Sequence, residues 1–196
     1  DFLGNTKGAL LLEPSRSNSI TYSEDFSNSF WTKSNTTVTS GFASPSGDLN
    51  AFKFLNNAVT STHYLLRSGN IVTSGVDYTF SIFAKKGENN FITLMLQGSG
   101  WLNSTKQVSF NLLNGTFDYA DSGITYKSTL LNNGFYKIEV TNETASTSVN
   151  LRVYSSTTVN DVSSYLGDGT SGIYIYGAQL EAGSYATSYI PTSGSA

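Results

Sequence analysis

The sequence predicts an all-β fold, a two-sheet antiparallel β-sandwich of jelly-roll type formed by residues 1–196 as a single domain. Three observations support this fold class. Apolar and polar residues alternate with a period of two over many short segments, turn-forming residues separate these segments, and no stretch shows helical periodicity over three turns. No linker, composition break or internal repeat divides the chain.

The clearest strands are those in which apolar residues recur at every second position, because such residues share one face of a strand. Tyr78, Phe80, Ile82 and Ala84 give the longest example. Residues 78–85, 108–112, 136–140 and 149–153 alternate in this way. Further strands are expected at residues 9–12, 19–22, 36–39, 51–55, 63–66, 91–97, 124–130 and 173–180, which are rich in β-branched and aromatic residues.

The segments between these strands carry residues that favour tight turns. Asn114-Gly115 and Asn133-Gly134 supply the positive φ angles that short hairpins need. Turns are also expected at residues 44–48, 86–90 and 167–170.

Composition excludes several classes of function. Only 13% of the residues are charged and the net charge is −3, so the chain lacks the basic field that nucleic-acid binding requires. No apolar run approaches the roughly 18 residues of a membrane helix, so we expect no membrane insertion. Without cysteine the chain can form no disulfide. Its 30 serines, 23 threonines and 18 asparagines are typical of an extracellular or virion surface, and its first residue, Asp1, suggests a segment excised from a longer protein.

Catalytic residues are scarce, and we expect the domain not to be an enzyme. His63 is the sole histidine, and no serine lies in the Gly-x-Ser-x-Gly motif of a nucleophile elbow. Pairs of carboxylates that could serve a glycosidase lie in turn-like segments, where hydrogen bonding within the loop is their expected role.

Calcium is the one metal that the composition leaves open, because its ligands are oxygen atoms. The weak candidates are Glu24 and Asp25 with Asn28, or alternatively Asp161 and Asp168. No Asp-x-Asp-x-Asp-Gly loop is present, and plain Asx turns are the favoured explanation of these residues.

The polar faces of the alternating strands carry aromatic, amide and guanidinium groups as well as hydroxyls. Sugars need this mixture, since a flat ring stacks on a pyranose and amides or guanidinium bind its hydroxyl or carboxylate groups. We expect Trp101, in a glycine-rich loop, and Tyr154 to stack on sugar rings. The expected hydrogen-bonding residues are Arg152, Gln97, Gln107, His63, Arg67 and Lys85.

Several motifs resemble one known family. They are GALLLEPSRSN at residues 8–18, YSEDFSN at 22–28 with WTK at 31–33, and GDGTSGIYIYGAQLE at 167–181, continuing into SYIPT at 188–192. DYTFSIFAK at 77–85 and NGFY at 133–136 also fit, with Phe135 where the family often has Trp. Together they resemble the carbohydrate-binding-module-like β-sandwich domain of bacteriophage tail, fibre and head-spike proteins, which is also appended to some polysaccharide-degrading enzymes.

This resemblance implies a non-catalytic domain that binds an extended polysaccharide on a concave sheet face, within a parent protein that carries a catalytic or fibre domain. The cationic candidates suggest an acidic polysaccharide. A calcium site is not implied residue by residue, because Gly177 and Ala178 stand where related modules often have Asp. The motif residues Glu13, Arg16, Asp168 and Glu181 are expected to be structural. The alternative function is a structural or oligomerisation domain of a phage fibre or virion protein, and a glycan lyase or hydrolase is a remote third.

Overall fold

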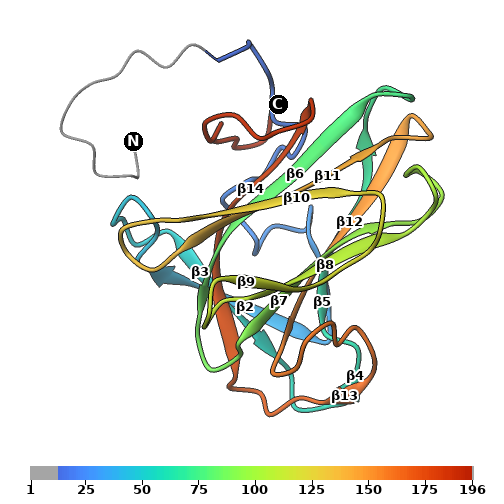
Figure 1. Ribbon diagram of the computed structural model, residues 1–196. Coiled ribbons are helices and arrows are strands. Elements are labelled where there is room, and N and C mark those ends of the chain that lie inside the picture. Colours follow the sequence, from blue (N-terminus) through green and yellow to red (C-terminus); the bar gives the residue numbers. More distant parts are fainter. Residues whose placement is uncertain (1–12, 196) are drawn as a thin grey trace.

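A computed structural model describes residues 13–195, so the strand expected at residues 9–12 lies outside it. Two six-stranded antiparallel sheets pack face to face, which confirms the predicted all-β sandwich (Figure 1). The described residues contain no helix, and hence none that could cross a membrane.

We name each sheet after its most informative strand. The β12 sheet contains, in spatial order, β1 (Thr32–Ser34), β5 (Tyr64–Ile71), β12 (Ser148–Ser156), β7 (Phe91–Gln97), β8 (Lys106–Asn111) and β9 (Thr116–Ala120). The β14 sheet contains β10 (Thr125–Leu130), β11 (Tyr136–Glu143), β6 (Asp77–Lys86), β14 (Gly172–Ala182), β3 (Ala51–Asn56) and β2 (Thr36–Phe42). The short strands β4 (Thr60–Ser61) and β13 (Tyr165–Leu166) pair with each other at the lower end of the sandwich in Figure 1.

Most predicted strands are confirmed to within two or three residues at each end. The strand expected at residues 19–22 is wrong: only Tyr22 forms an isolated bridge, with Ser193. Neighbouring backbone groups bond elsewhere, since the Ser19 amide donates to the Leu180 carbonyl and the Ile20 amide to the Asn18 side chain. The strands β1, β4, β9 and β13 were not predicted. Three of them have only two or three residues, and β9 is an edge strand whose side chains are mostly exposed, so its hydrophobic alternation is weak.

The core lies between the two sheets and follows the predicted alternation. Ile82 and Ile138 of the β14 sheet and Leu94 and Leu151 of the β12 sheet are fully buried. Burial of each such side chain stabilises the fold by about 1.5–3 kcal/mol. The sandwich is therefore held by apolar contact between the sheets, and the outer face of each sheet is left for other roles.

The terminal segments cover the outer face of the β14 sheet, and the family-like motifs make the contacts. Asn18 is completely buried; its Nδ2 donates to the carbonyls of Ala178 and Ile190, and its Oδ1 accepts from the amides of Ile20 and Leu180. One side chain thus joins both terminal segments to β14, and it connects the Ser-Arg-Ser-Asn motif with the Gly-Ala-Gln-Leu-Glu motif.

Glu181 anchors the same region from the end of β14. It is fully buried, and its carboxylate accepts the amide and the hydroxyl of Thr187, at 2.7 and 2.6 Å, and the Gln179 amide at 2.8 Å. The Arg16 guanidinium lies 3.7 Å from it. Since a buried charge is tolerated only when it is paired and hydrogen-bonded, this set of donors supports the structural role expected of Arg16 and Glu181.

Three partly buried tyrosines give the protein a distinctive alkaline titration. Desolvation raises the pKa of Tyr165 to about 12 and raises the pKa of Tyr176 and Tyr189 as well. Tyrosine in an unfolded chain has a pKa near 10. Between these values the folded protein keeps protons that the unfolded chain has released, so the free energy of unfolding must fall as pH rises above about 10.

We therefore expect several of the 12 tyrosines to lag in a spectrophotometric titration of phenolate absorbance and to ionise together as the protein unfolds. Tyr165→Phe removes one late group, and it should reduce the loss of stability between about pH 10 and 12 in urea unfolding curves. A titration in which every tyrosine ionises near pH 10 without unfolding would contradict the burial of these rings.

Candidate binding face

Strand register brings part of the predicted site together on the outer face of the β12 sheet. Arg152 of β12 lies directly opposite Met95 of β7, which lies opposite Gln107 of β8. Gln97 lies opposite Asn150, two residues before Arg152. These residues alternate with the buried core positions of the same strands, so they share the face that points away from the core.

Arg152 is held in a fixed orientation at the centre of this face. Its guanidinium carbon lies 4.3 Å from the centroid of the Tyr64 ring, and its Nη1 donates to the Tyr154 hydroxyl at 3.1 Å. Its Nε is buried without a hydrogen-bond partner. Among the described residues no carboxylate lies within ion-pair distance of Arg152. The face therefore presents an immobilised cation that has no acidic partner from residues 13–195.

The segment at residues 157–164, which follows β12, crosses part of the same face. The Asn160 amide donates to the Ser109 hydroxyl at 3.0 Å, and Gln107 Nε2 donates to Asn160 Oδ1 at 2.8 Å. Asn160 adopts a φ of 53°, in the left-handed region that asparagine tolerates better than most residues. Gln107 thus borders the open part of the face and is oriented by this segment.

Tyr154 corrects one expectation, because its ring is only 3% exposed and cannot stack on a sugar. Instead its ring packs against Tyr64, with 5.3 Å between the centroids, and its hydroxyl receives the hydrogen bond from Arg152. Tyr154 therefore positions Arg152. Tyr64 was missed as a site residue, although the alternation of β5 would have placed it and Leu66 on one face.

Trp101 is a second correction, since the predicted stacking platform is buried to 1% exposure. Its indole Nε1 donates to the Asn150 carbonyl at 3.2 Å, and its backbone forms an isolated bridge with Thr144. The glycine-rich loop packs closely: a Cβ on Gly100 would collide with the Ser148 carbonyl. The glycines let the loop fold inward and carry the indole into the core.

His63 is also buried, at 1% exposure, and is not available to a ligand. Both ring nitrogens face backbone carbonyl oxygens, Nδ1 that of Asn35 at 2.6 Å and Nε2 that of Tyr165 at 3.2 Å. A carbonyl oxygen can only accept, so the two contacts are both hydrogen bonds when both nitrogens carry protons. His63 thus joins the β1–β2 connection to β13.

Arg67 and Lys85 lie away from the Arg152 face. Arg67 is paired with Leu151, a core residue, and its guanidinium carbon lies 3.8 Å from the Phe30 ring centroid. Burial there lowers the pKa of Arg67. Lys85 lies on the outer face of the β14 sheet, opposite Tyr174. The expectation that these cations line one face with Arg152 is therefore wrong.

The calcium candidates are occupied by protein donors. Asp25 Oδ1 accepts the amides of Ser27 and Asn28, at 3.0 and 3.2 Å, and Glu24 Oε1 accepts the Tyr176 hydroxyl at 2.5 Å. No three His, Asp or Glu side chains in residues 13–195 are grouped as a metal site would need. The favoured explanation of Asp25, an Asx turn, matches this geometry.

The alternative carboxylates behave in the same way. Asp168 accepts the amides of Thr170 and Ser171, at 2.8 and 2.6 Å, and these hydrogen bonds with the Ser171 hydroxyl hold its pKa well below its usual value. Asp161 accepts the amide and the hydroxyl of Ser163, at 3.2 and 2.7 Å. Both residues therefore stabilise their own turns.

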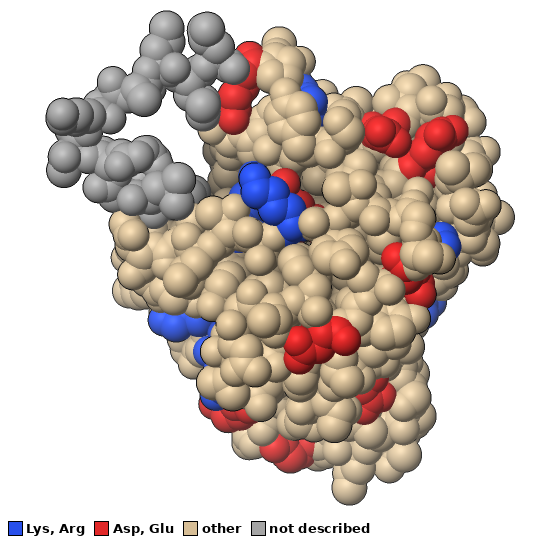
Figure 2. Space-filling view, in the orientation of Figure 1, with Lys and Arg blue, Asp and Glu red and all other residues tan. Residues whose placement is uncertain are grey.

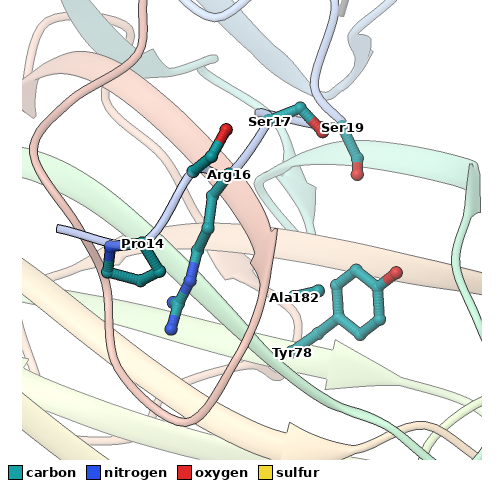
Figure 3. Close-up of a pocket in the computed structure, with 7 residues that line it drawn as sticks. Pro14, Arg16, Ser17, Ser19, Tyr78 and Ala182 are labelled. Carbon is teal, nitrogen blue, oxygen red and sulfur yellow. The ribbon is translucent and has the colours of Figure 1, made fainter.

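A pocket of about 310 Å³ opens between the N-terminal segment and the ends of β6 and β14 (Figure 3). Pro14, Arg16, Ser17 and Tyr78 are among the residues that line it. Arg16 already donates to the Tyr185 carbonyl at 2.5 Å, besides its ion pair with Glu181. Its cation is therefore less available than that of Arg152, and the pocket is the weaker candidate site.

Charged side chains are sparse on the surface. In Figure 2, lysine, arginine and the acidic residues stand mostly apart on a largely uncharged face, with no broad patch of one sign. Such a surface suits contacts with neutral hydroxyl groups. On it, a single cation held in one orientation dominates the local electrostatic potential.

A scan against protein-family models and a search of curated proteins both find no match. Among solved structures, the chain is similar to the crystal structure of the bacteriophage CBA120 tailspike protein 4 enzymatically active domain, with 14% sequence identity and a TM-score of 0.48. The match covers 84% of this chain and about a fifth, 21%, of that one. Because the TM-score lies below 0.5, we base no functional argument on this similarity.

Proposed function

We propose that the chain is a non-catalytic carbohydrate-binding domain that recognises an extended polysaccharide on the outer face of the β12 sheet. The observation that carries the proposal is the guanidinium of Arg152, which is held in one orientation and has no acidic partner among residues 13–195. Gln97 and Gln107 lie on β7 and β8, the next two strands of the same sheet. Three adjacent strands span about 10 Å, which gives an extended rather than a point-like contact.

The chemistry of these side chains supports the proposal. Amide groups donate and accept at the same time, as hydroxyl groups do, and a guanidinium offers up to five donors in one plane. Met95 lies between Arg152 and Gln107, but it is buried at 8% exposure, and its sulfur accepts from the Tyr154 hydroxyl at 3.9 Å. With Trp101 and Tyr154 buried, hydrogen bonding by Arg152, Gln97 and Gln107 takes the leading role that we had expected of aromatic stacking.

We place this domain in a larger extracellular or virion-surface protein, which the composition and the sequence motifs support. It would hold a polysaccharide while other domains act on it, with no reaction of its own. The engagement of His63 by two backbone carbonyls supports the absence of catalysis. Release of new reducing ends from a retained polysaccharide would overturn this part of the proposal.

Affinity electrophoresis in gels that contain a polysaccharide tests the binding face. We expect Arg152→Ala combined with Gln97→Ala to weaken retention at least tenfold, because a hydrogen bond to a charged group contributes about 1.5–3 kcal/mol. Lys85→Ala is the matched control, since it removes one positive charge from the outer face of the other sheet. Equal retention of the double variant and the control would show that the polysaccharide does not bind on this face.

A second candidate, an assembly domain of a fibre or virion, is favoured by one edge of the sandwich. There the edge strands β9 and β10 meet, with 4.7 Å between the ring centroids of Phe117 and Tyr126. Tyr119, Tyr126 and Leu130 are 37%, 43% and 58% exposed. Light scattering over a range of protein concentrations distinguishes the two, because an assembly domain would form a stable oligomer and the binding domain would stay monomeric.

A further inference from the structure

Arg152 forms no ion pair with any carboxylate in the described part of the structure. The described part of the structure contains three ion pairs, Arg16–Glu181, Lys53–Glu88 and Lys137–Glu139, and Arg152 belongs to none of them. A guanidinium carries its charge at any ordinary pH. Arg152 therefore presents a permanent positive charge in the middle of the proposed binding face.

One edge of this guanidinium has no hydrogen-bond acceptor among residues 13–195. Nη1 is used by the Tyr154 hydroxyl, whereas Nε has no hydrogen-bond partner and no residue in 13–195 accepts a hydrogen bond from Nη2. Nε and Nη2 carry parallel N–H groups, and this edge matches the two oxygens of a carboxylate in a bidentate pair. A buried N–H without a partner is rare in folded proteins, so the free Nε points to a missing acceptor.

The surroundings of Arg152 fix the orientation of the edge formed by Nε and Nη2. The Tyr64 ring stacks on the guanidinium plane, and Tyr64 in turn packs on Tyr154. Fixing the plane in advance reduces the conformational entropy that a ligand would have to remove. Gln97 and Gln107 flank this position and suit the hydroxyls of the same ligand.

We infer that the ligand of this face is an acidic polysaccharide, and that a uronate carboxylate pairs with the Nε–Nη2 edge of Arg152. The inference rests on the proposed function and adds the chemical class of the ligand. A neutral hydroxyl can accept only at one point of this edge and leaves the charge uncompensated. Selection for acidic sugars follows from this difference.

The test uses pairs of polymers that differ in the carboxyl group alone. Polygalacturonate, alginate and hyaluronate are each compared with their carboxyl-reduced products in affinity electrophoresis of the wild-type protein. We expect at least one acidic polymer to be retained about 10- to 100-fold more strongly than its reduced product, as a charged bidentate contact predicts.

Arg152→Lys distinguishes the bidentate geometry of the guanidinium from its positive charge. The lysine keeps the positive charge but cannot form a bidentate pair, so we expect it to lose most of the preference for the acidic polymer. Arg152→Gln should lose the preference completely, so that it retains the acidic polymer and its reduced product equally. Thermal unfolding of both variants establishes that they are folded before retention is compared.

The outcomes separate the inference from the proposed function. Equal wild-type retention of an acidic polymer and its reduced product, or retention of neutral polymers alone, overturns the inference and leaves carbohydrate binding in place. Strong retention of a sulfated polymer that carries no carboxylate, by both wild type and Arg152→Lys, also overturns it, because negative charge without a carboxylate would then suffice. Retention of no polymer at all contradicts the proposed function itself.

Discussion

Glu181→Ala is expected to lower the free energy of unfolding by about 3–5 kcal/mol, the range measured when one partner of a buried ion pair is removed. The carboxylate of Glu181 is fully buried and accepts hydrogen bonds from Thr187 and Gln179. Its loss leaves the Thr187 amide and hydroxyl without acceptors and Arg16 without its counter-charge, at 3.7 Å in the wild type. Urea unfolding followed by tryptophan fluorescence measures the change.

Glu143→Ala is the matched control for this variant. Glu143 lies near the end of β11 directly opposite Asp77, so its removal relieves a repulsion between like charges. We expect this control to be neutral or slightly stabilising. A Glu181→Ala protein that is as stable as the control would mean that the terminal segment is not anchored by the buried carboxylate.

The terminal motifs make further hydrogen bonds beside Glu181. Glu13 accepts the Ser188 amide through both carboxylate oxygens, at 3.0 and 2.9 Å, and Lys137 donates to the Thr187 carbonyl at 2.7 Å. The motifs at the two ends of the chain are therefore parts of one hydrogen-bonded layer over β14. These contacts lie over β14 and not on the Arg152 face.

The sequence predicted the fold well because alternation reports burial directly. In β6 and β12, each inward residue is buried by the facing sheet, and the period of two follows from that contact. Alternation also identified Arg152, Gln97 and Gln107 as outward residues. It could not show that Lys85 faces out from the other sheet, because the assignment of strands to sheets depends on pairing between distant segments.

Burial of outward residues could not be predicted for a related reason. Tyr154 has the alternation of an exposed residue, yet it is covered, on a face that the segment at residues 157–164 crosses. Nothing local to Tyr154 indicates that Asn160 will bond to Ser109 of another strand. Prediction of site residues on a sheet face therefore requires the path of the long connections that cross it.

Trp101→Ala tests the most consequential of these corrections, because the sequence made Trp101 a ligand platform and the structure makes it core. We expect the variant to lose about 3–5 kcal/mol in the free energy of unfolding, the usual cost of truncating a buried tryptophan to alanine. The indole is 1% exposed and its Nε1–H is satisfied by the Asn150 carbonyl. Leu102→Ala, next in the same loop but 40% exposed, should cost far less.

Polysaccharide binding by this variant must be measured on folded protein, because unfolded protein would also lose retention. At temperatures below its unfolding midpoint, the folded Trp101→Ala protein should bind polysaccharide as the wild type does, because the indole contributes no exposed surface. Asn150 links the two regions, because its carbonyl accepts from the indole and it lies opposite Gln97. A variant of normal stability that no longer binds would instead place Trp101 in the binding site and contradict its burial.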